Sequence, residues 1–197
     1  MRIAITGTHG TGKTTLAQAL SIRTGLPLIT EQARLVAAEM SLTECNQLLR
    51  NPRLAKTFQW EILERQIAEQ MKYPSGFIAD RSALDSIVYW QLYLGNNQDF
   101  KSEASRYIFK ARLHAWKNLD LLVYVPPVVL AGEDGFRLKD RHIEVDLFIR
   151  REVKLLQESG RVQVIVLKSE TLDGRLAEIE LALEKTKSPQ RSLAHAK

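Results

Sequence analysis

Apolar residues gather in five short runs along the chain, and between these runs they recur at the three- and four-residue spacing of helices. The runs cover residues 2–6, 26–30, 77–79, 119–125 and 162–167. Runs this short and this continuous predict strands that are covered on both faces. Because helical segments separate them, we expect a parallel sheet of five strands flanked by helices, which is an α/β fold.

Capping signals mark the beginning of two helices. Ser41 followed by Glu44, and Ser82 followed by Asp85, have the serine-to-acid spacing of a capping box. We therefore expect a short helix to open at Ser41–Glu44, and a longer one to open at Ser82 and end at Gly95. Further helices are expected over residues 13–23, 32–40, 52–71, 101–117 and 172–185, and from the end of segment 128–141 to about residue 159.

The length of 197 residues fits one domain, which we expect over residues 1–184. Segment 128–141 has two glycines and mixed charges, and we expect it to form a lid. Residues 185–197 hold four cations and no acid, and we expect this basic tail to be disordered. Subtracting these four from the net charge of +5 leaves +1 for residues 1–184, so the charge only weakly supports a nucleic-acid partner.

Cys45 is the only cysteine, which excludes an internal disulfide and a cysteine-rich metal site. No apolar run approaches the roughly 20 residues of a membrane helix, and the first residues lack the pattern of a signal peptide. We expect a cytoplasmic protein with no membrane partner. The sequence indicates no oligomeric state.

The segment Gly7-Thr8-His9-Gly10-Thr11-Gly12-Lys13-Thr14 matches the phosphate-loop pattern Gly-x-x-x-x-Gly-Lys-Thr, between an expected strand and an expected helix. Its glycines allow backbone N–H groups to point at phosphate oxygens, and the helix N-terminus adds positive charge. Lys13 can reach the β- and γ-phosphates, and the Thr14 hydroxyl can ligate magnesium. We expect this loop, together with Thr15, to bind a nucleoside triphosphate with Mg²⁺. His9 stands at a variable position of the loop and receives no catalytic role.

Two absences narrow the class of phosphate-loop protein. Neither Asn-Lys-x-Asp nor Asp-x-x-Gly, which guanine-specific GTPases carry, occurs in the chain. Hydrolytic ATPases usually end an acidic strand in Asp-Glu, whose glutamate activates water, but here the third apolar run ends in Asp80-Arg81-Ser82. A cation in place of that glutamate favours phosphoryl transfer over hydrolysis.

These motifs together resemble the nucleoside and nucleotide kinases, and most closely small AAA-type ATPases and kinases related to the ribosylnicotinamide kinase domain. The similarity rests on the phosphate loop, on Asp80-Arg81-Ser82, on Glu31-Gln32-Ala33-Arg34 and on Asp134-Gly135-Phe136-Arg137. It covers residues 1 to about 180. It implies a three-layer P-loop NTPase fold with strand order 2-3-1-4-5, ATP and Mg²⁺ as ligands, and a phosphate site at the carboxyl ends of strands one and three.

The resemblance implies roles for two carboxylates. Asp80, at the end of a strand beside the phosphate loop, would hold magnesium with Thr14 or accept the proton of the acceptor. Glu31, at the end of the neighbouring strand, is the second candidate for this base. The sequence leaves open which carboxylate is the base.

Arginines complete the implied site. Arg81 would neutralise the transferring or acceptor phosphate, and Arg34 would contact the acceptor. Arg137, and with it Arg141, would close over the triphosphate with the lid. Structural roles stay open for the same residues. Asp80 and Arg81, and likewise Glu31 and Arg34, could form only structural ion pairs, and the lid arginines could be solvated charges.

Other residues favour structural roles. We expect His114 and His142 at the surface or in caps. Five aromatic residues on expected helices are assigned to the core, with one of the first two available to stack on an acceptor base: Phe58, Trp60, Tyr89, Trp90 and Tyr93.

We expect ATP γ-phosphate transfer to a hydroxyl or phosphate of a nucleoside-like small molecule whose identity the sequence does not give. One alternative is a kinase acting on nucleic acid, which a positive surface near Arg34, Arg50 and Arg53 would support. The other is a regulatory ATP-binding module, against which a tight pocket between the helices at 32–40 and 52–72 would count.

Overall fold

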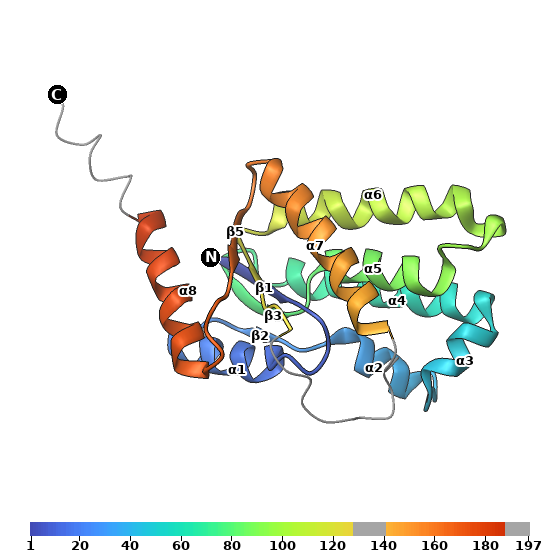
Figure 1. Cartoon of the computed structure of the whole chain (residues 1–197), viewed down its shortest axis with the longest axis horizontal. Coiled ribbons are helices and arrows are strands. Elements are labelled where there is room, and N and C mark those ends of the chain that lie inside the picture. Colours follow the sequence, from blue (N-terminus) through green and yellow to red (C-terminus); the bar gives the residue numbers. More distant parts are fainter. Residues whose placement is uncertain (128–140, 188–197) are drawn as a thin grey trace.

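The computed structural model describes residues 1–127 and 141–187 and contains a five-stranded parallel sheet, shown at the centre of Figure 1. The strand order is β2-β3-β1-β4-β5, which confirms the predicted order 2-3-1-4-5. Every neighbouring pair of strands is parallel. The strands are β1 (Arg2–Thr6), β2 (Leu28–Ile29), β3 (Phe77–Asp80), β4 (Leu121–Tyr124) and β5 (Gln163–Val166).

The helices follow the predicted alternation with strands, and their ends lie within a few residues of those expected. No helix in the described part of the chain is long and apolar enough to cross a membrane. The longer helices are α1 (Lys13–Thr24), α2 (Gln32–Glu39), α4 (Pro52–Met71), α5 (Ala83–Leu94), α6 (Lys101–Asn118), α7 (His142–Glu158) and α8 (Leu172–Lys187), and the short ones are α3 (Cys45–Arg50) and the 3-10 turn η1 (Gln98–Phe100).

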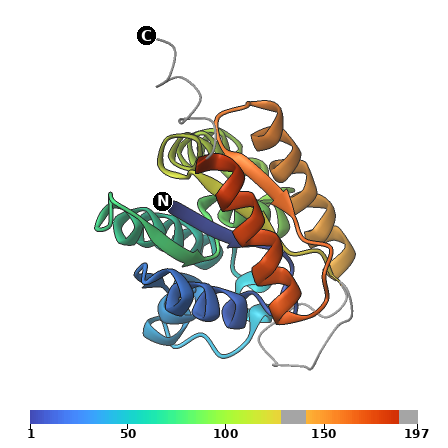
Figure 2. The same cartoon turned by 90° about the vertical axis from the view of Figure 1, so that its left-hand side faces the viewer.

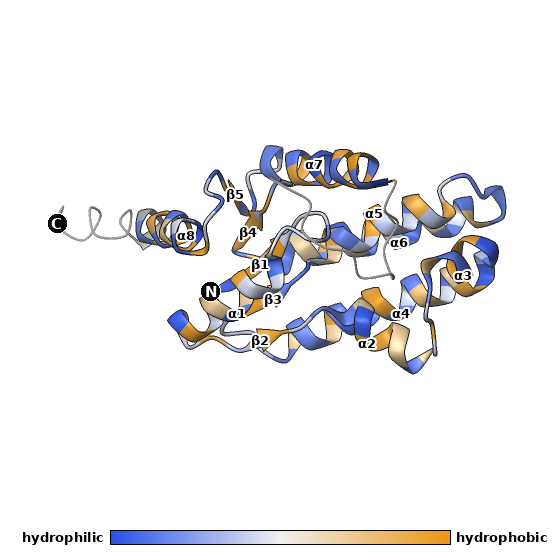
Figure 3. Cartoon of the chain, turned by 60° about the horizontal axis from the view of Figure 1, so that its bottom comes forward, coloured by the Kyte–Doolittle hydropathy of each residue, from blue (hydrophilic) through white to orange (hydrophobic). Residues whose placement is uncertain are grey.

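Alternate residues of the strands face two separate apolar cores, because side chains of a strand point to opposite faces. Ile3, Ile5 and Val123 belong to a core with α1 and α8, which cover one face of the sheet. Ala4 and Leu122 belong to a larger core with α2 and α4 to α7 on the other face. The helices in Figure 3 carry both hydrophobic and hydrophilic colours, as expected for helices with one packed face.

Aromatic packing between helices confirms most of the expected core residues. Trp90 is buried and stacks on Tyr107, with ring centroids 4.3 Å apart. Trp60 meets the same tyrosine edge-on and donates its indole N–H to Glu103. Phe58 is buried in the same core. Tyr93 and Tyr89 are half-buried on α5.

One predicted helix start is right and one is wrong. Ser82 and Asp85 form the expected capping box at the beginning of α5. The Ser41–Glu44 box does not form, because α3 begins three residues later with Glu44 itself as N-cap and Gln47 as its reciprocal partner. Glutamate can cap in this way because its carboxylate accepts backbone N–H groups as serine oxygen does.

Two predicted segments fall mostly outside the described residues. Of the expected lid, residues 128–141, only Arg141 is described, at the start of α7. The tail was expected to begin at residue 185, but α8 extends to Lys187, and residues 188–197 lie outside the described part.

His114 is buried, so its predicted place at the surface is wrong. Its Nε2 lies 2.7 Å from Oε1 of Gln70, and its Nδ1 lies 3.1 Å from Nδ2 of Asn118. These partners fix a neutral ring in which Nε2 carries the proton, because the amide oxygen accepts and the amide nitrogen donates. Burial, with the nearby charges of Arg2 and Lys110, lowers the pKa of His114 to about 4.

This buried histidine should make the folding stability depend on acid pH. The unfolded chain binds a proton at His114 near pH 6.5 but the folded chain only near pH 4, so the stability from this residue is lost as pH falls through that window. Urea unfolding at several pH values gives the free energy of unfolding as a function of pH. Between about pH 4 and pH 6.5 its slope against pH should be steeper for wild-type protein than for His114→Gln, by up to about 1.4 kcal/mol per pH unit. Equal slopes for the two proteins would refute this assignment.

Candidate active site

The phosphate loop joins β1 to α1, and all three of its glycines have positive φ, with Gly10 at 75°. Gly7 has φ 149°, and a Cβ there would stand 2.4 Å from the carbonyl oxygen of Val125 on the neighbouring chain segment. Gly12 caps α1 with φ 82°. A side chain at either position would strain the turn that aims the N–H groups of the loop at a ligand.

Lys13 is buried beneath the loop, and its Nζ donates to the carbonyl oxygen of Thr8 and, at 3.4 Å, to Oγ1 of Thr11. Burial, together with the positive charge of Arg81, lowers the pKa of Lys13 to about 7. An incoming phosphate would supply the negative charge that this amine lacks. The geometry thus suits phosphate binding, as the sequence predicts.

Thr14 and Asp80, the two predicted magnesium ligands, lie together. Thr14 donates its hydroxyl hydrogen to Oδ2 of Asp80 at 2.6 Å. Oδ1 of Asp80 is buried and has no hydrogen-bond partner among the described residues. Burial raises the pKa of this carboxyl, against the hydrogen bond from Thr14 and the charge of Arg81. A hydroxyl beside an unsatisfied carboxylate oxygen fits Mg²⁺, which prefers oxygen ligands and needs only one or two carboxylates beside phosphate.

Within residues 1–127 and 141–187 there is no cluster of three or more histidine, cysteine, aspartate or glutamate side chains that could hold a metal. A protein-only metal cage is therefore absent from the described part, and a magnesium ion here would depend on the phosphates of its nucleotide for further ligands.

Arg81 is the most constrained residue of the site. Its backbone has φ 91°, which is unusual for a residue with a side chain, and its guanidinium is buried. Nε donates to Oε1 of Glu31 at 3.0 Å, and Nη1 donates to Oδ1 of Asp85 at 2.9 Å and to the carbonyl oxygen of Gly7 at 3.0 Å. The guanidinium therefore ties the phosphate loop to the ends of β2 and β3.

Glu31 lies between two arginines. Its Oε2 accepts from Nε of Arg34 at 2.9 Å, and its Oε1 accepts from Arg81. The i,i+3 pair considered for Glu31 and Arg34 is present, but the second bond to Arg81 makes Glu31 part of the larger cluster. The side chain of Glu31 is 12% exposed and that of Arg34 is 58% exposed. Glu31 therefore lies inside the site, and Arg34 lies at its solvent-exposed edge.

Two pockets meet at this cluster. The first is lined by the phosphate-loop residues Gly10, Gly12, Lys13 and Thr14, with Glu31, Arg34 and Arg81. The second lies between α2, α4 and α5, and Glu31 and Arg81 line it as well. Of the other loop residues, Gly7, Thr8 and Thr11 are buried, Thr15 is exposed on α1, and His9 lines the second pocket.

The second pocket is mainly apolar and aromatic. Phe58 and Ile62 of α4 face Tyr89, Leu92 and Tyr93 of α5 across it. This is the position between the second and fourth helices where the sequence predicts an acceptor pocket. Trp60, the other aromatic proposed for stacking, is not part of its wall.

Buried amides on α4 interrupt this apolar wall. Gln59 is 1% exposed, and its side-chain oxygen has no hydrogen-bond partner among the described residues although it lines the pocket. Gln66 donates to the carbonyl oxygen of Arg81 at 3.3 Å. Sequence reasoning missed both. Gln59, Gln66 and Gln70 share one helical face at spacings of seven and four residues, a polar pattern on a buried face that could have revealed them.

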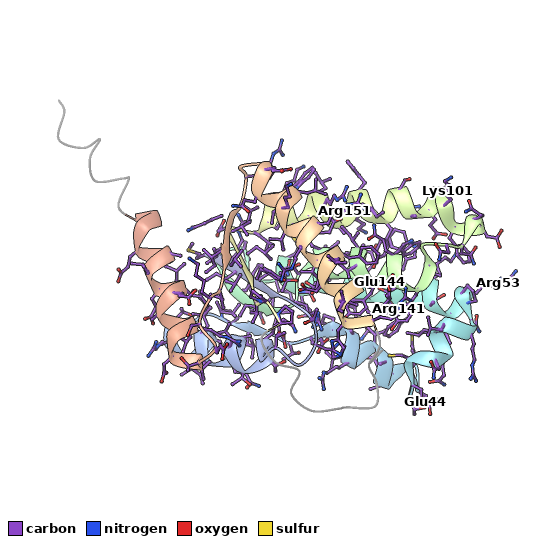
Figure 4. All side chains as sticks on the ribbon, in the orientation of Figure 1. Glu44, Arg53, Lys101, Arg141, Glu144 and Arg151 are labelled. Carbon is purple, nitrogen blue, oxygen red and sulfur yellow. The ribbon has the colours of Figure 1, made fainter. Side chains whose placement is uncertain are left out.

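Of the two arginines expected in the lid, one does not line the phosphate-loop pocket and the other lies outside the described residues. Arg141 donates to both carboxylate oxygens of Glu144, at 2.5 and 2.6 Å, and to the carbonyl oxygen of Leu92 at 3.2 Å. Figure 4 shows Arg141 and Glu144 together at the start of α7. Arg137 lies outside the described residues. The bonds of Arg141 go to Glu144 and Leu92 and not to the phosphate loop.

His142, expected at the surface or in a cap, is half-buried and is the first residue of α7, after the N-cap Arg141. Its ring centroid lies 3.6 Å from that of His9. The phosphate loop thus packs against α7 through a residue to which the sequence gave no role.

A family model described as an AAA domain matches residues 2–175. The chain belongs to this AAA-domain family. No curated protein matches the sequence. The match spans the loop, the Asp80–Arg81 cluster and both pockets, and it ends on Arg175.

Solved structures of several kinases share the fold of this AAA-domain protein at low sequence identity. Deoxyadenosine kinase from M. mycoides with bound dCTP has a TM-score of 0.68 and 18% identity over 94% of this chain and all of its own. NadR in complex with NAD and AMP-PNP has a TM-score of 0.60 and 18% identity. The match covers 92% of this chain but only 48% of the NadR chain. Shikimate kinase from Aquifex aeolicus has a TM-score of 0.53 and 16% identity, and the match covers 95% of this chain and 99% of the shikimate kinase chain. These likenesses confirm the P-loop kinase fold that the motifs indicate.

Nucleotide binding should be coupled to proton uptake at Lys13. Above its pKa of about 7 the empty site holds mostly neutral lysine, and phosphate charge raises that pKa. Calorimetric titration of ATP at about pH 8, in buffers of different ionisation enthalpy, should show an uptake approaching one proton per nucleotide. The uptake should vanish at about pH 6, where the lysine is already charged, and affinity should weaken as pH rises above 7.

Lys13→Arg is the matched control, because a guanidinium keeps its charge at every pH used. It should show no proton uptake at either pH. Absence of uptake in wild-type protein that binds ATP would contradict the low pKa of the lysine.

Proposed function

We propose that this AAA-domain protein is a magnesium-dependent kinase that transfers the γ-phosphate of ATP to a hydroxyl or phosphate of a nucleoside- or nucleotide-like small molecule. The observation that carries this proposal is the junction of the two pockets at Glu31 and Arg81. A hydrolase needs only the phosphate pocket and a water. A second pocket that opens beside the phosphate pocket gives an acceptor a place from which to attack in line.

The two carboxylates then take different roles. We assign Asp80, which is bonded to Thr14, to the magnesium side of the site. When bound, the metal would neutralise charge on the phosphates. We assign Glu31 as the base, because it lines both pockets whereas Asp80 lines neither.

In the proposed reaction, the acceptor oxygen attacks the γ-phosphorus as Glu31 accepts the proton of the acceptor hydroxyl. The bond between the γ-phosphorus and the oxygen bridging it to the β-phosphate breaks, and ADP leaves with that electron pair. Lys13 and the N–H groups of the loop stabilise the phosphate charge, while Arg81 and Arg34 fix the orientation of Glu31. Positioning and charge stabilisation supply most of the catalysis.

The walls of the second pocket support a flat, partly apolar acceptor. Phe58 and Tyr89 offer apolar surface, and the unpartnered oxygen of Gln59 requires a hydrogen-bond donor. A heterocyclic base or a carboxamide ring with an N–H group meets both conditions. This chemistry favours nucleosides over simple sugars or alcohols.

The alternatives have less support. Arg50 and Arg53 are exposed, as a nucleic-acid site would require, but Arg34 is engaged by Glu31. A pocket walled by helices suits a small molecule better than a strand. The same pocket counts against a purely regulatory ATP-binding module. Cys45 forms no disulfide, which fits the proposed cytoplasmic location.

A screen of nucleosides, nucleotides and ribosylnicotinamide with labelled ATP tests the reaction, and modified DNA serves as the nucleic-acid arm. Glu31→Gln should lower kcat about 100- to 10,000-fold because the proton acceptor is lost. Asp80→Asn should instead weaken Mg²⁺-dependent ATP binding about 10- to 100-fold.

Glu39→Gln is the matched control, because Glu39 lies exposed at the end of α2, the helix that begins after Glu31. It should leave both kcat and the affinity for ATP with Mg²⁺ unchanged. The proposed kinase fails if no acceptor speeds ATP consumption over the rate of Lys13→Ala. The assignment of the base fails if Glu31→Gln turns over normally.

Gln59→Met should separate stability from acceptor binding. The substitution removes a buried oxygen without a partner, so the melting temperature should rise, while affinity for acceptors that donate an N–H should fall about 5- to 100-fold. Thermal unfolding and acceptor titration with a non-hydrolysable ATP analogue measure the two effects. An unchanged acceptor affinity would remove Gln59 from the acceptor site.

A further inference from the structure

Arg175, on the first turn of α8, bonds to the phosphate loop at Thr11, whereas Arg81 bonds to it at Gly7. The guanidinium of Arg175 is buried, and Nη1 donates to the carbonyl oxygen of Thr11 at 2.7 Å across 164 positions of sequence. Nε donates to the carbonyl oxygen of Ser169 at 3.0 Å. The same Nη1 would stand 3.1 Å from a Cβ on Gly12. Figure 2 shows the beginning of α8 beside α1.

The segment before α8 holds Arg175 in place. The backbone N–H groups of Lys168 and Ser169 donate to the two carboxylate oxygens of Glu178, at 2.9 and 2.7 Å. Thr171 accepts from the N–H of Gly174 at 3.2 Å. The carbonyl of Ser169, which receives Nε, is thus itself fixed, and the guanidinium has one defined orientation.

The bond to Thr11 acts on the next residue through the peptide group. The carbonyl of Thr11 and the N–H of Gly12 belong to one peptide unit, and a cation bonded to the oxygen polarises the N–H into a stronger donor. The same bond keeps the carbonyl oxygen directed away from the phosphate site. Arg81 makes the equivalent bond to the carbonyl of Gly7, so each end of the loop has a buried arginine on a carbonyl oxygen.

We propose that Arg175 is a positioning residue of the donor site, which raises affinity for the phosphates of ATP by orienting and polarising the Thr11–Gly12 peptide. The inference rests on the proposed function in taking a nucleoside triphosphate as the ligand. Neither the loop motif nor the acceptor-side cluster contains Arg175. It acts through the loop backbone, because it bonds to Thr11 and does not line the phosphate-loop pocket.

Arg175→Met tests the proposal, since methionine keeps the apolar stem of the side chain and loses both hydrogen bonds and the charge. The Kd for ATP, measured by calorimetry, should rise tenfold or more. The Kd for adenosine, which has no phosphate, should change less than twofold when it is measured by competition with ATP, so that it reports on the donor site. A merely structural role would weaken both ligands together. The KM for the acceptor should stay within twofold, because no residue of α8 lines the acceptor pocket.

Arg23→Met is the matched control. Arg23 joins α1 to α8 by an exposed ion pair with Glu180, at 3.1 Å, and does not touch the loop. It should leave the Kd for ATP within twofold. Should Arg175→Met fail to fold, Arg175→Lys keeps the charge but cannot span both carbonyls, and it should raise the Kd for ATP several-fold.

The outcomes separate the two proposals. If wild-type protein and Lys13→Ala both fail to bind ATP, the donor site and this inference fall together. If wild-type protein binds ATP and Lys13→Ala does not, but either Arg175 variant binds as tightly as wild type, only the role of Arg175 is refuted. A parallel loss of ATP and adenosine binding refutes it equally, because it shows a structural role.

Discussion

The buried guanidinium of Arg81 is the interaction on which the rest of the site depends. It stands in a backbone conformation that costs about 1–3 kcal/mol, and it persists because two carboxylates and the carbonyl of Gly7 share its hydrogens. Removal of the Arg81 guanidinium would leave the buried Asp85 and the largely buried Glu31 without their shared partner, at a cost of about 3–5 kcal/mol. One residue therefore fixes the loop, the carboxylate at the end of β2 and the start of α5.

The sheet explains why these groups can meet. β1 lies between β3 and β4, so the loop after β1 stands beside the end of β3, where Asp80 and Arg81 begin the next connection. β2 pairs with β3 on its far side and brings Glu31 to the same edge. Parallel order 2-3-1 thus places three segments that are distant in sequence around one phosphate position, as carboxyl ends of strands do in open α/β sheets.

Motifs with fixed local geometry could be predicted from the sequence, and contacts set by packing could not. The phosphate loop and the cap at Ser82 follow from short patterns whose chemistry is local. The Thr14–Asp80 pair joins residues 66 positions apart, and it is expected only because the motifs resemble those of known kinases. The bond from Arg175 to Thr11 joins residues 164 positions apart and has no local signature. The burial of His114 also depends on the helices packed around it, which composition alone does not reveal.

The two apolar cores have a consequence for divergence within the family. The helices α1 and α8 pack on one face of the sheet, and the walls of the second pocket come from helices packed on the other. Substitutions that reshape those walls therefore leave the packing behind the phosphate loop untouched. A fold divided in this way can change the shape of the second pocket over evolutionary time while it keeps the phosphate loop.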